Sequence, residues 1–203
     1  MKNVWCSCLI LLIVAPIAFA AENEVEKKAP NDPEKLMRVK WDAIVKVLQN
    51  DKFDKAAKIK HIDKIIDPLF DFPLMAKLAL GREHWPKLNA AQREKFSKLF
   101  VKLLKETYRE KISLYTNEEL LFKPPLKKTK TVIQIPAELM YKDKKVTMLY
   151  KLRKLEKRWK IYDVEIQGVS VLLTYRSQFD DILSNSTVED LLSRLEKPKA
   201  PAD

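Results

Sequence analysis

The chain has 203 residues, two cysteines and a formal net charge of +11. Cys6 and Cys8 both lie close to the N-terminus, so the composition excludes a disulfide-stapled scaffold, and the fold must be held by its own core. The positive charge favours anionic partners: lipid headgroups, a membrane surface, an acidic protein face or nucleic acid.

Residues 1–20 have the three parts of a secretory signal peptide. Lys2 gives a short positive start, residues 4–19 form an apolar run, and AFA at 18–20 is an A-x-A cleavage site. The run is shorter than the roughly 20 residues that a membrane-spanning helix needs. We therefore predict export with cleavage after Ala20; the alternative is an uncleaved anchor. Export argues against a nucleic-acid partner.

The exported chain is predicted to form one domain at residues 32–197, between a polar leader at 21–31 and a tail at 198–203. Asp32 followed by Pro33 is a helix start, because proline fits the first helical position. Asp51 is predicted to begin a second helix, which Pro68 ends. The apolar residues expected on these two helices are Leu36, Val39, Ile44, Val47, Leu48, Phe53, Ala56, Ala57, Ile62, Ile65 and Ile66.

Two more helices are predicted before the chain changes period. Asp71 begins a short one, and Gly81 fits the left-handed position that ends it. Asn89 and Gln92 have the spacing of a capping box at the start of the longest helix. The apolar stripe of that helix is predicted to be Phe96, Leu99, Phe100, Leu103, Leu104, Tyr108, Ile112 and Tyr115.

After Asn117 the apolar period changes to two, which predicts strands at 119–123, 130–141, 144–156 and 158–166. The short connections predict an antiparallel meander with one apolar and one polar face. The apolar face is expected to carry Ile133, Ile135, Ala137, Leu139, Tyr141, Val146, Met148, Tyr150, Leu152, Tyr162, Val164 and Ile166.

Two helices are predicted to close the domain. Gly168, one of two glycines, lies at the corner where the last strand meets the first of these helices. Ser186 and Glu189 have capping-box spacing for the second helix. The two stripes are expected to be Val169, Leu172, Leu173, Phe179, Ile182 and Leu183, then Val188, Leu191, Leu192 and Leu195. This order predicts an α+β fold with helices packed on one face of a four-stranded antiparallel sheet.

Few residues are arranged for catalysis or for metal binding. His61 and His84 have no second histidine or cysteine at a ligand spacing, so we predict no metal site. Ser170 follows Gly168 without the second glycine of a nucleophile elbow. Asp163 could be an acid in an apolar pocket, but alternation points it away from the apolar face and favours a strand-edge or helix-capping role. We therefore predict no catalytic residue and no cofactor.

Basic side chains gather on the strands and their turns. They could bind polyanions, or they could form a solvated face that discourages edge pairing. The aromatic residues nearby fall on the apolar face and are not interleaved with the lysines, which argues against binding of single-stranded nucleic acid. The basic residues are Lys142, Lys144, Lys145, Lys151, Arg153, Lys154, Lys157, Arg158 and Lys160.

Several motifs, in order along the chain, resemble those of the MlaC-type phospholipid-binding proteins, also called the toluene-tolerance family of ABC transporter auxiliary components. They begin with FDFPLM at 70–75, Leu80-Gly81 and Trp85. AQREKF at 91–96, Phe100, Tyr108 and YKL at 150–152 follow. WKIYDV at 159–164, EIQGVS at 165–170 and YRSQF at 175–179 complete the set.

The resemblance implies an NTF2-like cone, in which a curved sheet and helices enclose an apolar cavity for lipid tails. It implies a periplasmic protein that binds phospholipid and no other cofactor. Its partners would be an inner-membrane MCE–ABC transporter complex and an outer-membrane lipoprotein–porin complex. Lipid shuttled between these would maintain outer-membrane lipid asymmetry. We expect a monomer.

Periodicity alone cannot distinguish a filled core from a hollow one, so the cavity residues rest on the resemblance. Ser170, at the start of a helix, is a candidate to meet a phosphate, and Tyr175 and Arg176 are weaker headgroup candidates. Two alternatives stay open: an NTF2-like enzyme that uses Asp163, and an exported adaptor without ligand. The residues predicted to contact lipid tails are Phe72, Met75, Leu78, Phe100, Leu103, Ile133, Ile135, Leu139, Met148, Tyr150, Tyr162, Val164, Val169 and Leu172.

Overall fold

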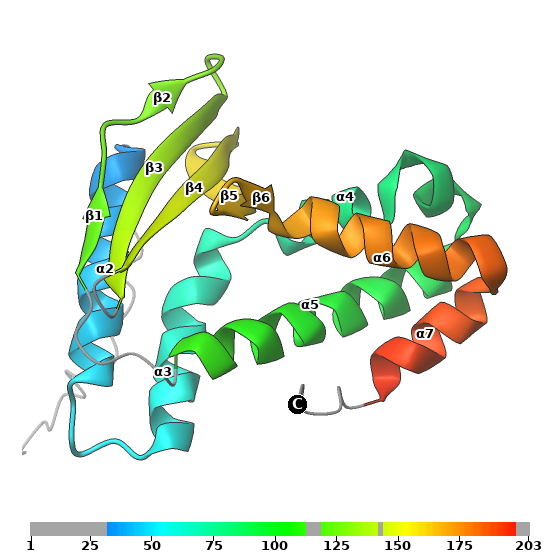
Figure 1. Cartoon of the computed structure of the whole chain (residues 1–203), viewed down its shortest axis with the longest axis horizontal. Coiled ribbons are helices and arrows are strands. Elements are labelled where there is room, and N and C mark those ends of the chain that lie inside the picture. Colours follow the sequence, from blue (N-terminus) through cyan, green and yellow to red (C-terminus); the bar gives the residue numbers. More distant parts are fainter. Residues whose placement is uncertain (1–31, 113–118, 142–143, 198–203) are drawn as a thin grey trace, which may run out of the picture. The chain divides into compact units, whose positions relative to one another are not determined.

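The structure, a computed structural model, describes residues 32–112, 119–141 and 144–197, which all lie in one compact unit, Asn31–Asp203. The predicted signal peptide, leader and tail lie outside the described residues. The helices are α2 (Pro33–Leu48), α3 (Lys55–Ile66), η1 (Asp67–Leu69), α4 (Phe72–His84), η2 (Trp85–Lys87), α5 (Ala90–Ile112), α6 (Val171–Asn185) and α7 (Val188–Glu196) (Figure 1). The strands are β1 (Leu120–Phe122), β2 (Leu126–Lys127), β3 (Val132–Tyr141), β4 (Lys144–Leu155), β5 (Arg158–Ile166) and β6 (Val169–Ser170).

Side chains cap the first helices as the sequence predicts, with one correction. The Asp32 carboxylate accepts from the Glu34 N–H at 2.9 Å and begins α2. The prediction that Asp51 begins α3 is wrong. Asp54 caps that helix by accepting from the Ala57 N–H at 2.7 Å.

Gly81 interrupts α4 where a break is predicted. Its φ of 78° is positive, but its ψ of 176° is extended, so the residue kinks the chain between two helical segments rather than forming a left-handed cap. The Arg176 side chain packs on it, and a Cβ at Gly81 would lie 3.0 Å from Arg176 Nε. The position therefore needs glycine for its backbone and for its neighbour.

Two capping boxes were predicted from the same spacing, and one of them is displaced. Asn89 and Gln92 exchange hydrogen bonds of 2.9 Å at the start of α5, as predicted. At α7 the box is Thr187 with Asp190, one residue after the predicted pair of Ser186 and Glu189. Both pairs satisfy the spacing, so the pattern alone does not select between them.

The sheet is antiparallel and open, with strand order β1-β3-β4-β5-β6 and β2 paired to β3. The four predicted strands are present as a meander, but the count of four is wrong because two short strands extend the sheet. Leu126–Lys127 pairs with β3 after the prolines at 124 and 125, and Val169–Ser170 pairs with β5.

A two-residue turn at Gln167 and Gly168 produces β6. Their φ angles of 51° and 80° are those of a type I′ hairpin turn. The expectation that Val169 lies on the helix directly after the strand is therefore wrong, because Val169 pairs with Ile166. Ser170, predicted at the start of the helix, is its N-cap, and α6 runs from Val171. Gln167 is held in this unusual conformation because its backbone N–H donates to Thr147 at 2.8 Å and its side chain donates to Lys145 at 3.1 Å.

A β-bulge shifts the register between β4 and β5. Leu152 lies opposite Ile161, whereas Lys151 lies opposite Asp163, so Tyr162 has no direct partner on β4. Ile161 is buried, and Tyr162 is half-buried outside the clusters described below. The prediction that Tyr162 shares the apolar face is therefore wrong, whereas Val164 does pack on that face.

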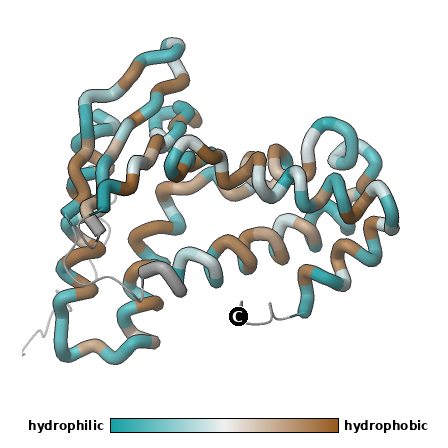
Figure 2. The backbone as a smooth tube through the Cα atoms, in the orientation of Figure 1, coloured by the Kyte–Doolittle hydropathy of each residue, from teal (hydrophilic) through white to brown (hydrophobic). Residues whose placement is uncertain are grey.

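Buried hydrophobic residues form three clusters instead of one core between helices and sheet. The helical cluster, which includes Phe96, Phe100 and Phe179, joins α4, α5, α6 and α7. The sheet cluster, which includes Ile133 and Ile135, joins the apolar face of the sheet to α2. A third, the α2–α3 cluster, consists of Ile44, Ile62 and Ile66. Hydrophobic and hydrophilic bands alternate along α5 in Figure 2, as expected of a helix buried on one side.

Within the described ranges, no helix is long and apolar enough to cross a membrane.

Candidate functional site

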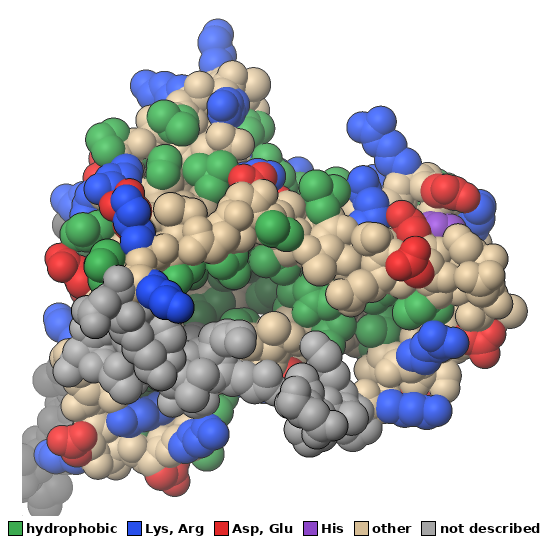
Figure 3. Space-filling view, in the orientation of Figure 1, with side chains coloured by type: hydrophobic (Ala, Val, Ile, Leu, Met, Phe, Trp, Pro, Cys, Tyr) green, Lys and Arg blue, Asp and Glu red, His purple; other side chains and the backbone are tan. Residues whose placement is uncertain are grey.

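Hydrophobic side chains line a hollow in the centre of the face shown in Figure 3. Half-buried hydrophobic side chains pack against the helical cluster and against the sheet cluster, so each of them remains partly accessible. Phe70 packs against all three clusters, and its ring stacks on Phe72 with centroids 5.6 Å apart. Large apolar side chains left partly open inside a fold suit an apolar ligand better than water.

The predicted tail contacts fall into three groups. Five are almost fully buried and fill the clusters: Met75, Phe100, Ile133, Ile135 and Leu172. Seven are half-buried, with Phe72, Leu78 and Leu103 on the helical cluster and Leu139, Met148, Tyr150 and Val164 on the sheet cluster. The structure does not bring the other two together with these, because Tyr162 follows the bulge and Val169 is 60% exposed on β6.

Phe70 is not among the predicted tail contacts, although it is the first residue of the FDFPLM motif. It lies on the short segment between η1 and α4, and it forms a bridge to Ile161 on β5. The Asp71 N–H donates to the Ile161 carbonyl at 2.8 Å and continues that pairing. No periodic pattern marks a single residue between two elements, so this position had no helical or strand signal.

Tyr150 brings a polar group into the apolar part of the site. It pairs with Ile135 on β3 and Val164 on β5, and its ring lies 6.0 Å from that of Phe122. Its hydroxyl donates to Met148 Sδ at 3.5 Å. Burial raises the pKa of the Tyr150 hydroxyl to about 12.

The N-terminus of α6 is already occupied by a carboxylate. Asp163 is buried, and its oxygens accept from the Ser170 hydroxyl at 2.8 Å and from the Leu172 N–H at 3.3 Å. Ser170 in turn accepts from the Leu173 N–H at 3.1 Å. This confirms the helix-capping interpretation of Asp163, and it places an acid where Ser170 was a candidate to meet a phosphate.

Lys151 neutralises the buried acid. Its ammonium group lies 3.0 Å from Asp163 and 2.5 Å from Glu165. Burial opposes the charged form, but hydrogen bonds to Glu165 and Asp163 outweigh it, so the pKa of Lys151 is raised. Lys151, a member of the predicted basic face, therefore belongs to a half-buried ionic network.

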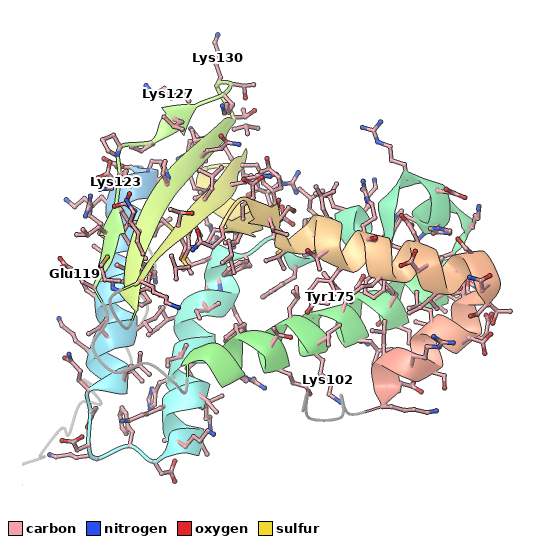
Figure 4. The ribbon with its side chains drawn as sticks, viewed as in Figure 1. Lys102, Glu119, Lys123, Lys127, Lys130 and Tyr175 are labelled. Carbon is pink, nitrogen blue, oxygen red and sulfur yellow. The ribbon has the colours of Figure 1, made fainter. Side chains whose placement is uncertain are left out.

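The two weaker headgroup candidates contact the helical layer. Tyr175 lies between α6 and α5 (Figure 4), where its ring meets Phe100 edge-on and its hydroxyl is 3.3 Å from Thr107. Arg176 donates two hydrogen bonds, of 3.1 and 2.8 Å, to the Leu78 carbonyl. Both side chains thus fix helices to one another.

An ion pair joins α4 to the sheet. Asp71 is buried, caps α4 through the Leu74 N–H at 3.2 Å, and accepts from Arg153 Nε at 2.5 Å. Lys145 of the basic face pairs with Glu138, and Lys123, which flanks β1, pairs with the same carboxylate. Lys127 and Lys130, at the end of β2 and the following turn, extend away from the sheet (Figure 4).

Neither histidine lies in a metal-binding group. His61 stacks on Phe53 with ring centroids 4.5 Å apart, and His84 Nε2 is 3.1 Å from Asp180. In the part of the chain that the structure describes, no three His, Cys, Asp or Glu residues gather so as to hold a metal ion.

Comparison with known proteins identifies similar chains. The family model named MlaC protein matches residues 39–197. A solved structure from Ralstonia solanacearum, a phospholipid-binding protein in complex with a phospholipid, is similar at 23% sequence identity with a TM-score of 0.72. The match covers 81% of this chain and 95% of that one. At this identity the likeness shows a common fold.

Proposed function

Because the chain belongs to the MlaC protein family, whose model matches residues 39–197, we propose that it is a phospholipid carrier that binds acyl tails in its apolar hollow. The observation that carries the proposal is the pair of half-buried surfaces, one on the helical cluster and one on the sheet cluster. The similar protein from Ralstonia solanacearum, solved with a phospholipid, supports the same class of ligand.

The physical need for such a carrier is large. Two acyl chains carry roughly 28 methylenes, and at about 0.8 kcal/mol each the free energy of wetting them exceeds about 20 kcal/mol. A carrier must offer the tails an environment close to that of a bilayer, but not a much better one, or it could not unload them. Flexible liners such as Met148 suit tails of varied shape.

We further propose that the open sheet and its helices act as an NTF2-like cone around the tails, with the headgroup at the mouth. Transport then consists of binding and release without bond chemistry. The contacts of Asp163 favour this over an enzyme, because Ser170, Leu172 and Lys151 all engage its carboxylate.

We propose that the protein works in the periplasm, after export and cleavage of the signal peptide behind Ala20. There the carrier would pass phospholipid between an outer-membrane lipoprotein–porin complex and an inner-membrane MCE–ABC transporter complex, and so maintain lipid asymmetry. Intact mass measurement of the protein from the cell envelope tests the cleavage, since a mature chain should begin at Ala21.

The carrier function is tested by extracting the natively purified protein with organic solvent and identifying the lipids by mass spectrometry. Co-purified phospholipid in stoichiometric amount is expected. A chain free of lipid that also fails to take up phospholipid from vesicles would favour the adaptor without ligand and would end the carrier proposal.

A further inference from the structure

The hydroxyl of Tyr150 lies among apolar side chains, and no residue that the structure describes offers it a strong acceptor. Tyr150 packs against the sheet cluster, with Phe122, Met148 and Val164 among the same group. Within the described residues, its one hydrogen-bond partner is Met148 Sδ at 3.5 Å, and a thioether is a weak acceptor. Buried tyrosine hydroxyls usually find a better partner.

Two other tyrosines of the chain show what such a partner looks like. The Tyr108 hydroxyl donates to the Asp63 carboxylate, and the Tyr175 hydroxyl lies 3.3 Å from the Thr107 hydroxyl. Both hydroxyls thus meet an oxygen that the protein supplies. At Tyr150 the described residues supply no such oxygen, so the position is open to an acceptor from a ligand.

The missing acceptor should be uncharged. Burial raises the pKa of the Tyr150 hydroxyl to about 12, so the hydroxyl stays protonated and acts as a hydrogen-bond donor. Among the described residues, no cationic side chain is hydrogen-bonded to it. A phosphate or a free carboxylate would need a cation beside it in such surroundings. The acyl ester carbonyl of a diacyl lipid is a neutral oxygen acceptor at the junction of tails and headgroup, so it suits this position.

We propose that the Tyr150 hydroxyl donates a hydrogen bond to an ester carbonyl of the bound lipid and thereby sets how deeply the lipid enters the hollow. This inference rests on the proposed carrier function. Tyr150 is then a positioning residue for ester-linked lipids rather than one more apolar tail contact.

The test compares two ligands and three proteins. The ligands are a short-chain diacyl phosphatidylcholine and the dialkyl ether analogue of equal chain length, which lacks both carbonyls. The proteins are wild type, Tyr150→Phe, which removes only the hydroxyl, and Tyr162→Phe as a matched control from the bulge. Affinities come from calorimetric titration below the critical micelle concentration.

Wild type and Tyr162→Phe should prefer the ester lipid by about fivefold, the value of one ordinary hydrogen bond, and Tyr150→Phe should lose that preference. A second measurement uses ester carbonyls labelled with carbon-13. Their infrared stretch in the wild-type complex should fall at the hydrogen-bonded frequency and should rise in Tyr150→Phe. The inference fails if Tyr150→Phe keeps the preference or if wild type has none. Failure of wild type to bind either lipid would instead reject the carrier function.

Discussion

The Asp163 carboxylate and the Ser170 hydroxyl lie 2.8 Å apart and join the last long strand to the start of α6. The same carboxylate accepts from the Leu172 N–H and pairs with Lys151. One buried acid therefore caps a helix, neutralises a lysine and ties the start of α6 to β5. We therefore expect Asp163 to stabilise the folded chain rather than to take part in catalysis.

Replacing Asp163 with Asn should lower the free energy of unfolding by about 2–3 kcal/mol, because it leaves Lys151 with one carboxylate and weakens the cap. The lipid content of the folded protein should not change. Denaturant unfolding and lipid extraction measure the two quantities. Asp181→Asn, on the exposed side of α6, is the control and should shift stability by less than about 0.5 kcal/mol. Wild-type stability in Asp163→Asn would refute the capping role.

The Asp71–Arg153 pair should couple α4 to the sheet energetically. Asp71 is only 5% exposed, so a double-mutant cycle with Asp71→Asn and Arg153→Gln should give a coupling of about 1–3 kcal/mol. The exposed pair of Lys87 on η2 and Glu83 on α4 is the comparison, and its cycle should give about 0–1 kcal/mol. Equal couplings in the two cycles would mean that the buried pair does not hold α4 to the sheet.

Met148 and Ile135 distinguish a hollow from a filled core. Both lie on the apolar face of the sheet, but Met148 is half-buried and Ile135 is fully buried. Met148→Trp should displace bound lipid and leave the fold largely intact, because the new ring enters the hollow. Ile135→Trp should instead destabilise the protein by about 1–3 kcal/mol or more, because no space is open there.

Thermal unfolding and lipid extraction on both variants check this prediction. Leu103→Trp provides a second probe from the helical side, since Leu103 is half-buried against the helical cluster. Loss of stability in Met148→Trp and Leu103→Trp comparable to that in Ile135→Trp would show that the hollow is packed and would contradict the proposed site.

Features with a local physical cause could be predicted from the sequence. The Asn89–Gln92 box depends on residues three apart, and the long strands follow from alternation, so both were found. Where two local solutions have the same spacing, the sequence did not select between them. Asp54, not Asp51, caps α3, and the capping box of α7 begins at Thr187, not at Ser186.

The remaining errors come from contacts between distant segments. The bulge that removes Tyr162 from the apolar face depends on pairing across two strands, and the turn at Gln167 is held by Thr147 and Lys145. The hollow also depends on contacts between segments that are distant in the sequence. Ile135 on β3 and Met148 on β4 both fall on the apolar face by alternation. That pattern does not show that Met148 stays half-buried while Ile135 is fully buried, because this depends on which other segments pack against each residue.

The last prediction concerns Asp63, a residue of α3 whose carboxylate bonds to side chains of α5. Tyr108 and Arg109 donate to its carboxylate, and Lys105 is near enough to contribute. Burial would raise the pKa of Asp63, but the hydrogen bonds from Arg109 and Tyr108 outweigh it, and the pKa is lowered from its ordinary value of 3.8. In the unfolded chain the acid therefore takes up a proton at a higher pH than it does in the folded chain.

It follows that the stability contributed by Asp63 is fully present above about pH 5 and is lost as the pH falls below about 4. Unfolding free energies of wild type and Asp63→Asn should differ most near neutral pH, and the difference should shrink as the pH falls below about 4. Asp42→Asn, at an exposed position of α2, should follow wild type at every pH. A difference between wild type and Asp63→Asn that stays constant down to the acid limit would mean that the Asp63 charge does not stabilise the contact between α3 and α5.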